Sequence, residues 1–105
     1  MSLSSEKIKE YRRIGHKLKP VVIVGDAGLS EGVQQEIIRA LNDHELIKIK
    51  VHSADREQKK LVISSICESH GCALVQSIGS VALVFKEAAG ERPALSNISR
   101  YYLSK

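Results

Sequence analysis

Cations near the start of the chain are the side chains in this sequence best suited to chemistry. Residues 1–19 hold six lysines and arginines against two glutamates, while the other ten basic and ten acidic residues cancel, so this segment carries the whole formal net charge of +4. On a helix, at about 100° per residue, five side chains fill one contiguous arc opposite an apolar side. These five are Lys9, Arg12, Arg13, His16 and Lys17, and Lys19 follows them. Such an arc can reach several phosphates of one nucleic-acid strand or groove; a solvated helix face is the alternative interpretation.

A G-x-x-G segment is the second candidate site. It consists of Gly25, Asp26, Ala27 and Gly28. Two glycines three residues apart let the backbone turn sharply and approach a ligand, and the start of the following helix presents N–H groups that suit a phosphate. An ordinary strand-to-helix turn is the alternative, and the acidic side chain in the loop would repel an anion unless it turns away. The spacing is neither G-x-G-x-x-G nor a P-loop, so no nucleotide cofactor is expected.

Other reactive side chains are scattered in a way that predicts neither catalysis nor a metal site. The four histidines lie in separate predicted elements, and no H-E-x-x-H or paired-carboxylate spacing occurs. Cys67 and Cys72 are five residues apart without a second pair, which favours reduced thiols over a zinc site. Cys67 lies on an apolar helix face and is interpreted as a core residue. We therefore expect a protein that is not an enzyme and needs no cofactor or small-molecule substrate.

Hydrophobic periodicity predicts an α/β fold with three helices and four strands, in the order α-β-α-β-α-β-β. The helices are expected over 4–18, from a cap at Ser30 to His44, and over 56–70; the strands are expected over 21–24, 46–52, 73–78 and 81–86. Strand–helix–strand units imply parallel neighbours, and the link Gly79-Ser80 suits a hairpin that adds one antiparallel strand. The expected architecture is a four-stranded mixed sheet that carries helices.

Alternation along the second strand assigns its two faces. Ile47, Ile49 and Val51 should be buried, with Lys48 and Lys50 on the opposite face. Four helical residues should join this core, namely Ile37, Leu41, Val62 and Ile66. Runs 21–24 and 81–85 are apolar on both faces, so the first helix or the end of the chain is expected to cover part of the second face. Residues 87–105 show no such pattern and are interpreted as a loosely attached tail beyond a domain of residues 1–86.

Composition excludes several classes of protein. The chain has 105 residues, 43% of them hydrophobic, which suits one compact domain. Apolar runs are a few residues long and the N-terminus lacks the apolar core of a signal peptide, so we expect a cytoplasmic protein without a membrane partner. Only four aromatic residues are present. Because single-strand readers stack bases on exposed aromatic rings, this composition favours recognition of folded RNA by backbone and shape.

Several segments resemble the CRM domain, which is named for chloroplast RNA splicing and ribosome maturation. The segment 16–30 (HKLKPVVIVGDAGLS) is similar to the opening of that domain, and 44–51 (HELIKIKV) is similar to its second strand. Asp55-Arg56, Gly71 and the segment 75–79 (VQSIG) fall where the family has its third helix, helix end and hairpin. The resemblance covers roughly residues 3–86, and as a single stand-alone domain the chain resembles the bacterial YhbY-type members.

The resemblance implies a fold similar to the C-terminal domain of translation initiation factor 3 and an association with precursors of the large ribosomal subunit. It also implies RNA contacts through the basic first helix and the G-x-x-G loop. In the family a basic or neutral residue often follows the first loop glycine, where this chain has acidic Asp26, and a Lys or Arg commonly follows the glycine of the hairpin, where this chain has Ser80. Both departures make the first helix the main expected RNA contact. We therefore expect a ribosome assembly factor that holds structured rRNA. The alternatives are a translation-factor-like binder of mature ribosomes and, in another class, a small phosphate-ligand enzyme that uses the loop.

Overall fold

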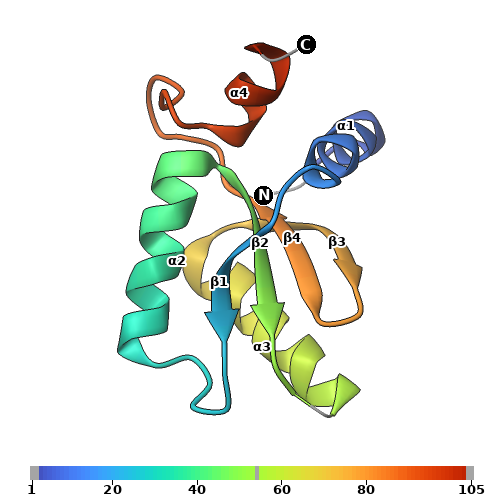
Figure 1. Ribbon diagram of the computed structural model, residues 1–105, viewed down its shortest axis with the longest axis vertical. Coiled ribbons are helices and arrows are strands. Elements are labelled where there is room, and N and C mark those ends of the chain that lie inside the picture. Colours follow the sequence, from blue (N-terminus) through green and yellow to red (C-terminus); the bar gives the residue numbers. More distant parts are fainter. Residues whose placement is uncertain (1–2, 54, 104–105) are drawn as a thin grey trace.

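The computed structural model describes residues 3–53 and 55–103 (Figure 1); residues 1–2 of the expected domain and 104–105 of the expected tail lie outside the described residues. Four strands form one mixed sheet, as predicted. They are β1 (Pro20–Val24), β2 (Leu46–Val51), β3 (Ala73–Ile78) and β4 (Val81–Phe85). Their order across the sheet is β1-β2-β4-β3. β1 pairs in parallel with β2, while β4 runs antiparallel to both β2 and β3.

The central position of β4 corrects the expectation that successive strand–helix–strand units make parallel neighbours throughout. The hairpin inserts β4 between β2 and β3, so those two strands are not adjacent. The sequence of β4 explains this place, because the strand is apolar on both faces. Ala82 and Val84 join the core on one face, and Leu83 and Phe85 join a second core on the other. A strand buried on both faces belongs in the interior of a sheet.

Two helices cover one face of the sheet. They are α2 (Glu31–His44) and α3 (Arg56–His70). Their caps are those expected from the sequence: the Ser30 hydroxyl accepts from Val33 N at 3.3 Å, the Asp55 carboxylate accepts from Glu57 N at 3.0 Å, and Gly71 ends α3 in the left-handed region at φ +64°. All of the predicted core residues are buried here except Val62, which is partly buried and packs against the cluster.

The opposite face is covered only in part, by α1 (Ser5–Gly15) and by a fourth helix, α4 (Asn97–Leu103) (Figure 1). Tyr11 and Ile14 of α1 and Ile98 of α4 pack on Leu83 and Phe85. The rings of Tyr11 and Phe85 lie 4.7 Å apart between centroids. This arrangement confirms that the first helix and the end of the chain share the cover of the second face. β1 lies outside that cover, with Val21 and Ile23 more than half exposed.

The first helix ends three residues before the predicted limit of residue 18. Beyond Gly15 the backbone closes tighter turns, in which Lys17 N donates to Ile14 O at 3.1 Å and Leu18 N donates to Gly15 O at 3.0 Å. Lys17 and Lys19 therefore belong to the segment that links α1 to β1, not to the helix.

The interpretation of residues 87–105 as a loosely attached tail was wrong for the part that the structure describes. Glu45 is fully buried and anchors this segment. Its carboxylate accepts from Ala88 N at 2.8 Å and from Ser96 Oγ at 2.7 Å, and it pairs with Arg92 Nε at 2.9 Å. The Asn97 amide donates to Leu46 O at 2.7 Å. Because these contacts are polar, hydrophobic periodicity carries no signal for them.

Candidate nucleic-acid interface

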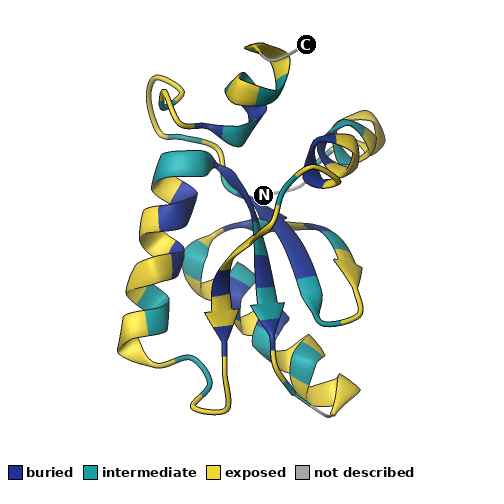
Figure 2. Cartoon of the chain, viewed as in Figure 1, coloured by how far each residue is buried: buried dark blue, intermediate teal, exposed yellow. Residues whose placement is uncertain are grey.

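The exposed side of α1, with the link that follows it, carries the predicted cations. Lys9, Arg12, Arg13, His16, Lys17 and Lys19 are all exposed, and we call these six residues the basic stripe. Figure 2 shows the division along α1 between a buried side toward the sheet and an exposed side toward solvent. Among the described residues, none of the six forms an ion pair within 4.0 Å. Their charges are thus available to an external anion.

The local sequence explains why the stripe faces outward. Ser4 caps α1, with its hydroxyl accepting from Lys7 N at 3.2 Å. The buried pair Tyr11 and Ile14 fixes the rotation of the helix against the sheet, so the residues between them point away. Arg12 and Arg13 occupy the last turn, where the negative end of the helix dipole favours cations. The packing of α1 on the sheet therefore turns the helical part of the stripe toward solvent.

Glu10 is the acid nearest to the stripe on α1, and its charge has partners of its own. Tyr102 of α4 donates a hydrogen bond to the Glu10 carboxylate, and Lys7 Nζ lies 3.4 Å from it. The hydrogen bond from Tyr102 is the main cause that lowers the pKa of Glu10, followed by the cations nearby. A carboxylate engaged in this way weakens the field of the stripe less than a bare one would.

The Gly25–Gly28 loop is an exposed turn between β1 and α2. Gly28 N donates to Gly25 O at 3.0 Å, and Gly28 needs to be glycine because its φ is +73°. Gly25 has no positive φ, and open space surrounds the position of its missing Cβ. Asp26 and Ala27 are exposed. Asp26 and Glu31, in the first turn of α2, add two acids here, which oppose a phosphate.

The stripe and the loop lie at opposite ends of the molecule. In Figure 1, whose vertical is the longest axis, α1 lies near the top and the turn after β1 lies at the bottom. β1, five residues long, separates them by roughly 15 Å at about 3.3 Å per residue. The structure therefore does not bring the two predicted groups into one pocket. A ligand that touches both has to extend along a large part of the 37 Å axis.

A second cationic cluster, at the start of α3, was missed in the sequence. Arg56, Lys59 and Lys60 line a hollow of about 290 Å³ together with Ser77 and Gly79 of the hairpin. Within the described chain, none of the three cations pairs with an acid. The first turns of a helix favour acids because of the dipole. Three cations near that end are the signal that would have drawn attention to this cluster.

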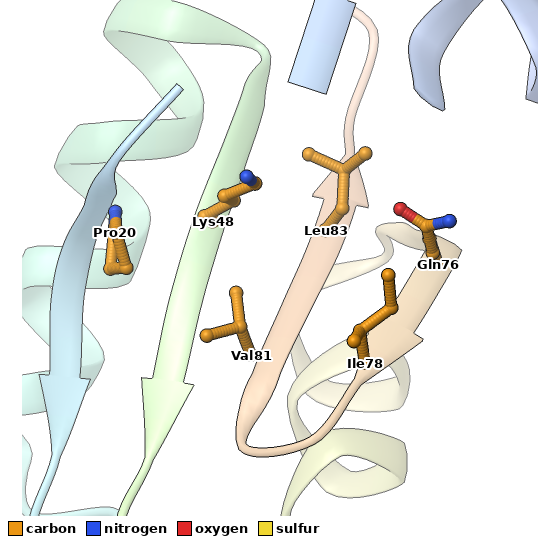
Figure 3. Close-up of a pocket in the computed structure, with 6 residues that line it drawn as sticks. All are labelled: Pro20, Lys48, Gln76, Ile78, Val81 and Leu83. Carbon is orange, nitrogen blue, oxygen red and sulfur yellow. The ribbon is translucent and has the colours of Figure 1, made fainter. Parts of the chain in front are cut away.

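The uncovered part of the sheet forms a third, more apolar surface. Figure 3 shows a shallow hollow there, of about 250 Å³, lined by Pro20, Lys48, Gln76, Ile78, Val81 and Leu83. Lys48 is the charged residue of this lining. As predicted, Lys48 and Lys50 lie on the face opposite buried Ile49, with their stems partly covered.

No grouping in the described part of the chain resembles a metal site, since no three His, Cys, Asp or Glu residues gather there. Cys67 and Cys72 lie beside one another as free thiols. A hydrogen bond from Cys72 lowers the pKa of Cys67 to about 7, and the same bond, with burial, raises the pKa of Cys72. Burial lowers the pKa of His70. Among the described helices, none has the length and apolar character needed to cross a membrane.

Known proteins match this chain over most of its length. Residues 3–86 match the model of the CRS1 / YhbY (CRM) domain. A probable RNA-binding protein of Pseudomonas aeruginosa is 48% identical over 101 residues, covering 96% of this chain and 97% of that one. An RNA-binding protein of Haemophilus influenzae is 46% identical over 87 residues, covering 82% and 88%. A solution structure from Staphylococcus aureus, 27% identical, matches 86% of this chain and 94% of its own with a TM-score of 0.74. The chain belongs to the CRS1 / YhbY (CRM) domain family.

Proposed function

We propose that this protein binds structured RNA through backbone phosphates and acts in the cytoplasm as an assembly factor on precursors of the large ribosomal subunit. The observation that carries the proposal is the basic stripe: six exposed cationic or titratable side chains on α1 and the link that follows it, without an ion pair among the described residues. Cations so arranged displace the counterions condensed on nucleic acid. The names of the Pseudomonas and Haemophilus relatives point to the same class of ligand.

The shape of the cationic surface favours a folded RNA segment as the ligand. The stripe lies at one end of the long axis, and the Gly25–Gly28 loop and the Arg56 cluster lie toward the other (Figure 1). A mononucleotide cannot span this distance, whereas a helical RNA segment can. Tyr11 and Phe85 pack inside the protein and offer no platform for stacking the bases of a single strand. Tyr102 is 47% exposed, but its ring lies edge-on to that of Tyr101, at 5.3 Å between centroids, and its hydroxyl donates to Glu10. The stripe is the main contact in this proposal, and the loop, which carries acidic Asp26, is a weaker one.

Charge reversal on α1 tests the proposal. We expect the double change Arg12→Glu with Arg13→Glu to weaken binding to a folded fragment of large-subunit rRNA. Both side chains are exposed, so the loss of stability should be limited to about 1–2 kcal/mol from two acids at the negative end of the helix dipole. If about four to six phosphates are contacted, log affinity should fall with log salt at a slope of roughly −3 to −5. Fluorescence anisotropy over a salt series measures both quantities.

The matched control compares two single reversals. Arg12→Glu and Arg39→Glu change the net charge equally, but Arg39 lies exposed on α2, whose buried residues pack on the other face of the sheet. Equal losses would reduce the effect to net charge and contradict the proposal, as would an affinity independent of salt. Sedimentation of cell extracts on a sucrose gradient then separates two roles: an assembly factor migrates with precursor particles, and a translation-factor-like binder migrates with finished ribosomes.

A further inference from the structure

The fourth helix is held beside α1 by three contacts. The Asn97 amide donates to the backbone of β2, the Ile98 side chain is buried in the second core, and Tyr102 donates to Glu10 of α1. The segment before α4 is fixed by the buried carboxylate of Glu45. Figure 1 shows α4 beside α1 at the same end of the molecule. α4 is thus a positioned part of the surface that carries the basic stripe.

This position brings a further cation next to the stripe. Arg100 of α4 is exposed and lines a hollow of about 290 Å³ between the two helices, which we call the α1–α4 groove. Lys17 lines the same groove, with its Nζ 5.6 Å from the centroid of the Tyr101 ring. The remaining lining residues are Ile14, Leu18 and Asn97, so no acid is among them. Two cations facing a hollow without an acid make a site for an anion.

We propose that the α1–α4 groove binds one backbone phosphate of the RNA, held between Lys17 and Arg100. This inference rests on the proposed function and extends it to a helix outside the 3–86 segment that matches the family model. The contact of Lys17 with Tyr101 restrains a flexible cation and so lowers the entropy lost on binding. Arg100 adds a planar fork of donors that suits phosphate oxygens. The role also gives a reason for burying Glu45, because the anchor holds Arg100 where the stripe ends.

The test compares three variants of the full chain on the same folded rRNA fragment. Arg100→Ala should weaken binding roughly three- to fivefold at low salt and make the salt slope shallower by about one unit, as expected for one lost phosphate contact. Arg100→Lys keeps the charge and should retain most of the affinity. Arg39→Ala removes an exposed arginine from α2 and should bind like wild type. Circular dichroism verifies that each variant is folded.

The outcomes show separately whether the groove binds phosphate and whether the proposed function holds. Wild-type binding by Arg100→Ala, together with weakened binding by the Arg12→Glu and Arg13→Glu protein, overturns the groove and leaves the proposed function standing. Wild-type binding by the α1 double variant overturns the proposed function itself. An equal loss in Arg39→Ala shows an effect of net charge and also overturns the groove. A loss confined to Arg100→Ala and largely restored in Arg100→Lys supports the groove.

A phosphate site can also serve free phosphate, and a second arm separates the two sources. The Arg100 Nε–H signal is followed by NMR during titration with inorganic phosphate and, separately, with the rRNA fragment. The inference predicts a saturable shift with RNA and only a weak, non-saturating shift with millimolar phosphate. Saturable binding of inorganic phosphate, with unchanged RNA affinity in Arg100→Ala, would assign the groove to a small ligand and overturn the inference.

Discussion

Replacing Glu45 by glutamine tests how the end of the chain is fastened. The carboxylate accepts hydrogen bonds from the backbone Ala88 N at 2.8 Å and from the hydroxyl Ser96 Oγ at 2.7 Å. It also forms an ion pair with Arg92 Nε at 2.9 Å. An amide of the same size offers one acceptor oxygen, and its NH₂ group must face a donor. Glu45→Gln therefore leaves at least one donor without an acceptor in a fully buried place.

The size of the stability loss in Glu45→Gln follows from how deeply Glu45 and its partner Arg92 are buried. Removing one partner of a buried ion pair costs about 3–5 kcal/mol. The side chain of Arg92 is 41% exposed, so water replaces part of its interaction, and we expect a loss of about 2–3 kcal/mol in the free energy of unfolding. For a chain of this size that corresponds to a fall of roughly 10 °C in Tm. Glu45 also holds a positive φ of 62°, a strain of about 1 kcal/mol or more that the side-chain contacts offset.

Two measurements check this expectation. Urea unfolding gives the free energy, and amide hydrogen exchange shows where protection is lost, which should be chiefly residues 86–103. Glu87→Gln, an exposed acid in the same segment, is the matched control and should change stability by less than about 0.5 kcal/mol. If Glu45→Gln were as stable as this control and exchanged no faster, the anchoring role would be refuted. Glu45→Gln removes no cation, but it releases α4 and so displaces Arg100. It should therefore cause the same loss of RNA binding as Arg100→Ala.

The remaining predictions concern the loop, the thiols and the contact of α1 with the sheet. If the loop touches RNA, Asp26→Lys should tighten binding by about 1 kcal/mol or less, and Gly28→Asp should weaken it. Fluorescence anisotropy at one low salt concentration measures both affinities, and circular dichroism checks that both variants fold. If neither variant changes the affinity, the loop is a structural turn. The rate at which iodoacetamide modifies Cys67 should rise with pH, with a midpoint near pH 7. Cys72→Ala should move that midpoint upward because it removes the hydrogen-bond donor. Equal midpoints in the two proteins, measured by mass spectrometry, would contradict this. The lowered thiol pKa also predicts that stability rises between about pH 7 and 9, since the unfolded chain binds more protons there. Gly15→Ala should lower stability by about 1 kcal/mol, as overpacking of about 1–3 kcal/mol exceeds the gain in helix propensity of up to about 1 kcal/mol; a higher Tm would refute the close contact.

Much of the fold was predictable because local signals agreed with one another. Caps at Ser30 and Asp55, alternation along β2 and the Gly79 turn each mark an element by short-range chemistry, and the structure contains them at these residues. The end of α1 was not predictable in this way. Its last residue, Gly15, lies against Leu83, which is a tertiary contact between residues far apart in the sequence.

The site was predictable to the extent that it lies on one short stretch of the sequence. The charge pattern of residues 9–19 sufficed to place the basic stripe on an exposed surface. Arg100 could not be added to it from the sequence, because residues 87–103 are fastened through Glu45, Asn97 and Ile98, which form no apolar repeat. The Arg56 cluster was missed because its cations are few and the hairpin that completes the hollow is remote in sequence.

Crosslinking of RNA to the protein in living cells, followed by sequencing of the bound fragments, tests the central claim most directly. The claim is that the basic stripe holds rRNA of the precursor large subunit. Wild type should yield fragments enriched in large-subunit rRNA, including precursor sequences absent from finished ribosomes, and the Arg12→Glu, Arg13→Glu protein at the same cellular level should lose them. Fragments without such enrichment, or an undiminished yield from the variant, would contradict the claim.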